Sequence, residues 1–201
     1  MGDPRAGRLR RLTAATLLAV VVVLVAVVLA ALFGGADQYL GSFSAHPWAA
    51  DVSLLSAPWL VLAFLAGWTQ RKPRQAALLG LACTVSALVA YGLMTLSPVE
   101  NAQPTLQSVA AFVRSESRVI VGGLLSGPLF GRLGHRWRTR RAWLGALAAA
   151  GAVCLEPIAR VPAGRAIRFS TVWKAEVAVG LAMVIYVAAQ TLAARAARDT
   201  V

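Results

Sequence analysis

The sequence is poor in the residues from which soluble enzymes and metalloproteins usually build their sites. Only 14% of its 201 residues are charged, and it has just two cysteines and two histidines. Cys83 and Cys154 lie within apolar stretches, where cysteine behaves as a small hydrophobic residue, so neither a disulfide nor a metal site is predicted. His46 and His135 stand alone in different loops and cannot form a zinc-type cluster. We therefore expect neither a metal nor a cofactor.

Familiar enzyme motifs are missing as well. The sequence has no Ser/His/Asp set, no nucleotide-binding glycine loop and no paired aspartates. Ser126, in a Leu-Ser-Gly-Pro segment, faintly resembles the nucleophile of an intramembrane serine protease, but no apolar segment contains the partner histidine. The sequence therefore favours a protein that is not an enzyme. An intramembrane enzyme that uses Glu156 is the third hypothesis, after the two non-enzymatic functions described at the end of this section.

What the chain has in excess is apolar residues, which make up 58% of the sequence and gather in six long stretches. A bilayer core about 30 Å thick needs about 20 apolar residues per helical span. The pattern predicts an all-α, polytopic transmembrane helical bundle that forms a single domain over residues 1–201. Its six expected spans are residues 12–33, 52–69, 75–96, 117–135, 142–160 and 174–194.

The distribution of charge predicts the orientation of these spans. With both termini in the cytoplasm, that side holds fourteen of the 20 Lys and Arg residues and two of the eight acids, whereas the outer side holds six of each. The whole net charge of +12 then lies on the cytoplasmic side, as the positive-inside rule requires. Anionic lipids at the cytoplasmic face are the expected partner of these cations, and a nucleic acid is not. The Arg-, Ala- and Gly-rich composition suggests a bacterial cytoplasmic membrane.

The first and fourth spans each leave an alternative open. Residues 12–33 are too long for the apolar core of a signal peptide, so a retained span is favoured, although Gly34-Gly35-Ala36 would suit a cleavage site. Between Arg118 and Arg132 only 13 uncharged residues remain, about 20 Å of helix. Snorkelling arginines would extend this fourth span, and a re-entrant hairpin is the alternative. Residues 106–113 are expected to form a short amphipathic helix at the membrane surface.

Small residues mark one face of the fourth span. Gly123, Gly127 and Gly131 recur every four residues, close to one helical turn, and Pro128 removes a backbone hydrogen bond among them. Such a groove allows another helix backbone to approach closely in lipid. Tight helix packing with a kink is the favoured interpretation. The alternative is a broken helix whose backbone faces a substrate cavity.

Glu156 is the acid that lies well inside a predicted span. It shares a helix face with Gly145, Ala149 and Ala152, so we expect it to face the protein interior. Pairing with Arg160, one helical turn away, is one interpretation, and a proton or substrate role is the other.

Tyr91 follows Gly80, Thr84 and Ala87 along a similar face of the third span. Glu156, Arg160 and Tyr91 therefore form the candidate intramembrane polar site.

Two segments carry a resemblance to a known family: SAPWLVLAFLAG at residues 56–67 and GGLLSGPLFGRLG at residues 122–134. Over roughly residues 54–157 the chain resembles a family of small actinobacterial multi-pass membrane proteins of unknown function. The resemblance implies an integral membrane protein and supplies no activity and no functional residues.

Two functions remain in competition. The first is a small-molecule binding or transport module, similar in length and helix count to the substrate-binding subunits of energy-coupling-factor importers. The second is a structural or accessory subunit whose glycine grooves pack against a partner membrane protein or a second copy of the chain. The sequence alone names neither a ligand nor a partner.

Overall fold

The computed structural model describes residues 4–43, 45–140, 143–160 and 170–199, and these contain α-helices and no β-strand. The all-α prediction is therefore confirmed. The elements in chain order are α1 (Pro4–Gly41), α2 (Pro47–Ser53), α3 (Ala57–Trp68), α4 (Pro73–Thr95), the 3₁₀ turn η1 (Pro98–Glu100), α5 (Leu106–Ser115), α6 (Ser117–Arg140), α7 (Trp143–Arg160) and α8 (Ser170–Asp199).

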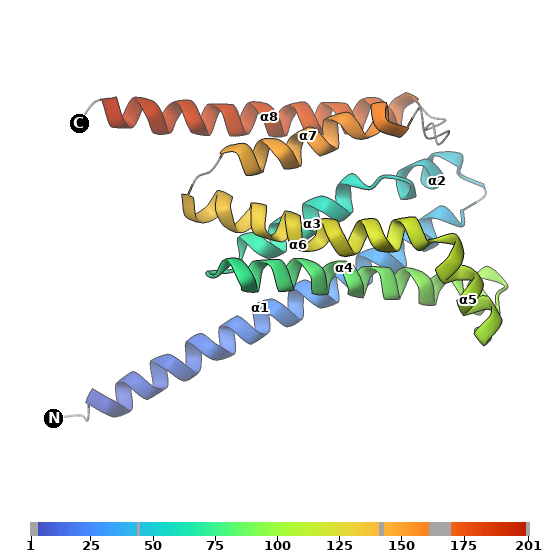
Figure 1. The fold of residues 1–201 in the computed structure, drawn as a ribbon, viewed down its shortest axis with the longest axis horizontal. Coiled ribbons are helices and arrows are strands. Elements are labelled where there is room, and N and C mark those ends of the chain that lie inside the picture. Colours follow the sequence, from blue (N-terminus) through green and yellow to red (C-terminus); the bar gives the residue numbers. More distant parts are fainter. Residues whose placement is uncertain (1–3, 44, 141–142, 161–169, 200–201) are drawn as a thin grey trace.

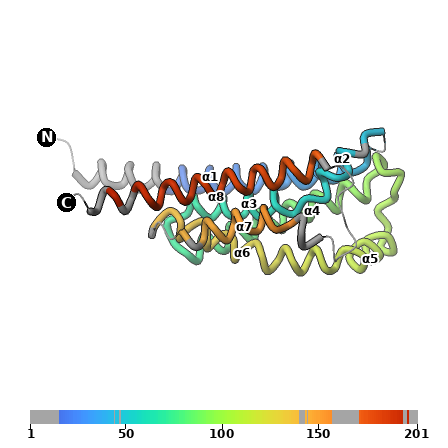
Figure 2. The backbone as a smooth tube through the Cα atoms, turned by 90° about the horizontal axis from the view of Figure 1, so that it is seen from above, coloured from blue at the N-terminus to red at the C-terminus, as the bar shows by residue number. Residues whose placement is uncertain are grey.

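The long helices form an elongated bundle (Figure 1). Helix α4 occupies its middle, where it packs against α1, α3 and α6, and α3 also packs against α6. Helices α7 and α8 form a hairpin that contacts the rest of the bundle mainly through α7. The start of α1 and the end of α8 lie at one end of the bundle, and α5 lies at the other (Figure 1). Figure 2 shows α5 again at one end of the molecule, with α8 running away from it.

Small residues fill the interior, and large apolar side chains lie outside. One buried cluster consists of Ala30, Ala66, Leu79, Cys83 and Ala87. The outer faces of α1 and α8 expose leucine, valine and isoleucine side chains over residues 17–32 and 179–192. In water this arrangement would be unfavourable, whereas in lipid it is the usual one, because small residues let helices approach while large ones face the acyl chains. The side-chain distribution therefore agrees with a membrane protein.

The structure supports only part of the expected six-span pattern. Within the described residues, three helical segments are long and apolar enough to cross a membrane: Thr16–Gly41, Pro73–Thr95 and Thr171–Ala193. Helix α3 has 12 residues, about 18 Å of rise, because the chain bends between α2 and α3. The apolar part of α7 is the equally short Gly145–Glu156. Helix α6 has 24 residues but bears arginine along its second half.

Two connections also differ from expectation. Helix α1 does not end at Phe33 but continues through Gly34 and Gly35 to Gly41. Gly34 packs directly on the backbone of Ala87, where a Cβ would overlap the Ala87 carbonyl group. Close helix packing thus compensates for the low helix propensity of glycine. Helix α6 is continuous, so the re-entrant hairpin is excluded, and residues 106–113 do form a helix, α5, which begins with a Thr105–Ser108 capping box.

Candidate functional site

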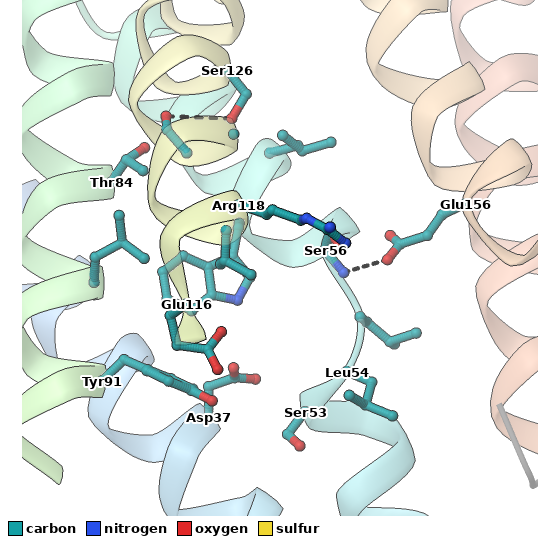
Figure 3. A pocket seen from close by; sticks show the side chains of 17 residues that line it. Asp37, Ser53, Leu54, Ser56, Thr84, Tyr91, Glu116, Arg118, Ser126 and Glu156 are labelled. Atoms are coloured by element: carbon teal, nitrogen blue, oxygen red, sulfur yellow. Dashed lines mark hydrogen bonds between the residues drawn. The ribbon is translucent and has the colours of Figure 1, made fainter. Parts of the chain in front are cut away.

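A partly open cavity of about 520 Å³ lies where α3 begins, bordered by α1, the α2–α3 junction, α4, α6 and α7. Apolar side chains and the backbone of Gly122 and Gly123 form much of its wall (Figure 3). Its described charged lining residues are Asp37 of α1, Glu116 just before α6, Arg118 of α6 and Glu156 of α7. Side chains distant in the sequence therefore meet in one place.

The start of α3 explains the position of Glu156. The first backbone N–H groups of a helix have no partner within it, and an apolar environment offers no water to replace one. Ser56, the N-cap residue, makes no capping hydrogen bond through its own side chain. Instead, the backbone N–H of Ser56 donates to Oε1 of Glu156 at 2.5 Å, and that of Ala57 donates to Oε2 at 2.6 Å. A carboxylate from α7 therefore caps α3.

The other end of α3 is capped by a cation from α6. Arg138 donates through Nη1 to the carbonyl oxygens of Trp68 at 3.2 Å and Thr69 at 2.8 Å. Its guanidinium group also lies 5.7 Å from the ring centre of Trp68. Nδ1 of His135 lies 3.0 Å from the Gln70 carbonyl oxygen in the following turn. An anion is favourable at a helix N-terminus and a cation at its C-terminus. The contacts of Glu156 and Arg138 therefore both complement the dipole of α3.

Asp37 lies in the opposite part of the cavity. Its side chain is only 9% exposed, and the side chain of Trp59 hydrogen-bonds to its carboxylate. Figure 3 shows the Glu116 carboxylate and the Tyr91 hydroxyl directed into the same region. The rings of Trp59 and Tyr91 are 6.2 Å apart and nearly edge-to-face. Two carboxylates and two aromatic rings thus form an acidic, aromatic end of the cavity.

The glycine face of α6 packs against α4. A Cβ on Gly127 would lie 2.6 Å from Oγ1 of Thr84, and one on Gly131 would overlap the Ala76 carbonyl group. Gly123 lies against Thr84 and Leu88 at the wall of the cavity.

Pro128 lies inside α6, which remains one helix from Ser117 to Arg140. The broken helix considered for this segment is therefore not α6. The interruption that borders the cavity is instead the α2–α3 junction, at Leu54–Ser56.

Of the three candidate polar residues, the structure brings Glu156 and Tyr91 to the same cavity. The side chain of Arg160 lies outside the described part of the chain. Sequence reasoning missed Asp37 and Glu116, which it assigned to outer loops, and Arg118, which it placed at the end of the fourth span. A usable signal existed for Asp37, since Ala30, Gly34 and Asp37 recur at steps of four and three, the spacing by which Glu156 was assigned to an inner face.

No arrangement of three or more His, Cys, Asp or Glu side chains suited to a metal ion occurs within the described residues. The chain was also compared with known proteins. A family model described as "Family of unknown function (DUF6518)" matches residues 13–201. Neither the curated proteins nor the solved structures gave a match.

Proposed function

This chain belongs to the DUF6518 family, a family of unknown function, and we propose that it is an integral membrane protein that binds a small molecule in the cavity at the start of α3. The observation that carries the proposal is the 520 Å³ cavity bordered by the break between α2 and α3 and by charged side chains from different helices. Binding is either the whole function or the first step of transport.

The size and lining of the cavity support this function. Small-molecule sites usually have volumes of about 300–1,000 Å³ and combine apolar walls with a few polar groups. Charged side chains are costly within a membrane protein and usually mark a ligand or ion path. Interrupted helices border substrate sites in many transporters. All three features coincide at the start of α3.

We further propose a cytoplasmic position for both termini in a bacterial cytoplasmic membrane. Helices α1, α4 and α8 would be full spans, and the shorter apolar cores of α3, α6 and α7 would cross beside them, with α3 and α6 packed on α4 and α7 packed on α8. Support comes from the charge asymmetry of the sequence and from the position of the start of α1 and the end of α8 at one end of the bundle. The cavity would then open toward the outer side.

An accessory role is the second candidate. Helix α8 packs mainly on α7 and exposes Leu181, Ile185 and Leu192. A partner membrane protein or a second copy of the chain would find a long apolar face there. In that case the cavity would have no ligand, and filling it would change nothing except local packing.

The experiment fills the cavity and measures access to it. Ser126, which lines the cavity, is replaced by cysteine in a Cys83→Ala, Cys154→Ala background, and whole cells are treated with a membrane-impermeant thiol reagent. We expect labelling of Ser126→Cys, slowed at least tenfold by Gly122→Phe. Gly122 lines the cavity, and a Cβ there would meet no atom within 4 Å.

Gly151→Phe is the matched control, because Gly151 is equally unobstructed but does not line the cavity. It should leave labelling unchanged. A panel of amino acids, ribonucleosides, polyamines and water-soluble vitamins is then tested for protection of Ser126→Cys. At least one compound should protect. No labelling, or no protection by any compound, would refute the binding function.

A further inference from the structure

We infer that the ligand of this cavity carries a positive charge, as a protonated amine or quaternary ammonium group, and that this group lies between Asp37, Glu116 and the rings of Trp59 and Tyr91. The inference rests on the proposed binding function and adds the chemical class of the ligand to it.

The charges that line the cavity are unevenly distributed. Three of the four charged lining residues that the structure describes are acids, and Arg118 is the cation among them. Figure 3 shows Arg118 directed toward Ser56 and Glu156, away from Asp37 and Glu116. The Glu156 carboxylate is already engaged by the two backbone N–H groups of α3. The negative charge that remains for a ligand is therefore that of Asp37 and Glu116.

The helix terminus that would attract an anion, the start of α3, is engaged within the protein. A helix N-terminus normally provides N–H groups and a positive dipole to a bound anion. At α3 this position is occupied by Glu156. The Arg118 guanidinium group points to the same carboxylate end. An anionic ligand at the start of α3 would have to displace Glu156, and one at the acidic end would meet repulsion from Asp37 and Glu116.

Aromatic rings favour an organic cation at the acidic end. A cation is attracted to the face of a Trp or Tyr ring, and aromatic cages bind quaternary ammonium groups in this way. Trp59 and Tyr91 both line the cavity. They belong to a chain of aromatic contacts. The ring centroids of Phe33 and Trp59 are 5.3 Å apart, and those of Phe112 and Tyr91 are 6.3 Å apart. The rings are therefore held in place before a ligand arrives.

The decisive measurement compares two probes of similar size and opposite charge. Phenyltrimethylammonium and benzenesulfonate are titrated by calorimetry into the full chain in phosphatidylglycerol nanodiscs. The cation should bind and the anion should bind at least tenfold more weakly. Asp37→Asn and Glu116→Gln should each weaken binding of the cation at least tenfold, whereas Glu100→Gln, outside the cavity, should leave it unchanged.

The same ammonium chemistry occurs in soluble amines and in lipid headgroups. Nanodiscs containing phosphatidylethanolamine distinguish the two sources: competition with phenyltrimethylammonium would identify a lipid headgroup as the ligand, and its absence would identify a soluble amine. Both outcomes support a cationic ligand.

Equal binding of the two probes by the wild-type protein would overturn the inference, and this comparison does not depend on the folding of any variant. Protection of Ser126→Cys by neutral or anionic compounds alone would overturn the cation inference and leave the binding function standing. Failure of every compound in the protection experiment would overturn both.

Discussion

The cap that Glu156 provides to α3 leads to a stability prediction that can be worked out from the structure. The Glu156→Gln substitution keeps the size of the side chain but removes its charge and replaces one oxygen by an NH₂ group. Both carboxylate oxygens accept hydrogen bonds, from the backbone of Ser56 and of Ala57. The amide therefore preserves one acceptor and brings an N–H donor against the other N–H.

The expected loss follows from typical hydrogen-bond energies. A hydrogen bond to a charged group contributes about 1.5–3 kcal/mol, and an unsatisfied buried donor costs about 1–3 kcal/mol. The favourable interaction of a carboxylate with the helix dipole contributes up to about 2 kcal/mol in partly buried geometry. Since the amide side chain would retain one weakened bond, we expect Glu156→Gln to lower the free energy of unfolding by about 2–4 kcal/mol. This corresponds to a fall of roughly 5–15 °C in the thermal midpoint of a chain of this length.

The assay is thermal unfolding of the purified protein in detergent, followed by tryptophan fluorescence. Glu100→Gln is the matched control, because Oε1 of Glu100 is buried without a hydrogen-bond partner, so the same chemical change there should be neutral or slightly stabilising. Glu156→Asp should be intermediate, since the charge remains but the side chain is one methylene shorter. A Glu156→Gln variant as stable as wild type would show that the carboxylate does not hold the start of α3.

Three further predictions concern helix packing, the other end of α3 and topology. Gly127→Leu should lower the thermal midpoint markedly, because even a Cβ at this position would lie 2.6 Å from Oγ1 of Thr84. Gly151→Leu should not, because a Cβ at Gly151 would have no atom within 4 Å. Equal midpoints of the two variants would contradict the α4–α6 contact. Arg138→Gln should cost about 1–2 kcal/mol in the same unfolding assay by removing the charged cap from the last carbonyl groups of α3, and an unchanged midpoint would show that this cap contributes nothing. A reporter that is active only in the cytoplasm should be active when fused after Val201, and a reporter that is active only outside the cell should be active when inserted between η1 and α5. The opposite pattern would reverse the proposed orientation.

Local sequence patterns predicted the helical segments well and their lengths poorly. The repeat of small residues around Glu156 correctly suggested an inward face, because a helix places residues three and four apart on one side whatever its neighbours are. The same repeat at Ala30, Gly34 and Asp37 was overlooked, since the first span was expected to end at residue 33. Their role depends on Ala87 of α4, which lies beside Gly34 only in the folded chain.

The composition and order of the residues by themselves determine that this is an all-α protein with helices suited to a membrane and with positive charge concentrated in particular connections. These properties follow from hydropathy, helical periodicity and charge, which act over a few residues at a time. Only the tertiary structure decides that α3 is short, and that Glu156 and Arg138 cap its two ends. The partners of Glu156 lie 99 and 100 residues away in the sequence, and no local pattern records a contact at that separation. The cavity has the same origin, because its walls come from six helices whose packing brings Asp37, Glu116 and Tyr91 together.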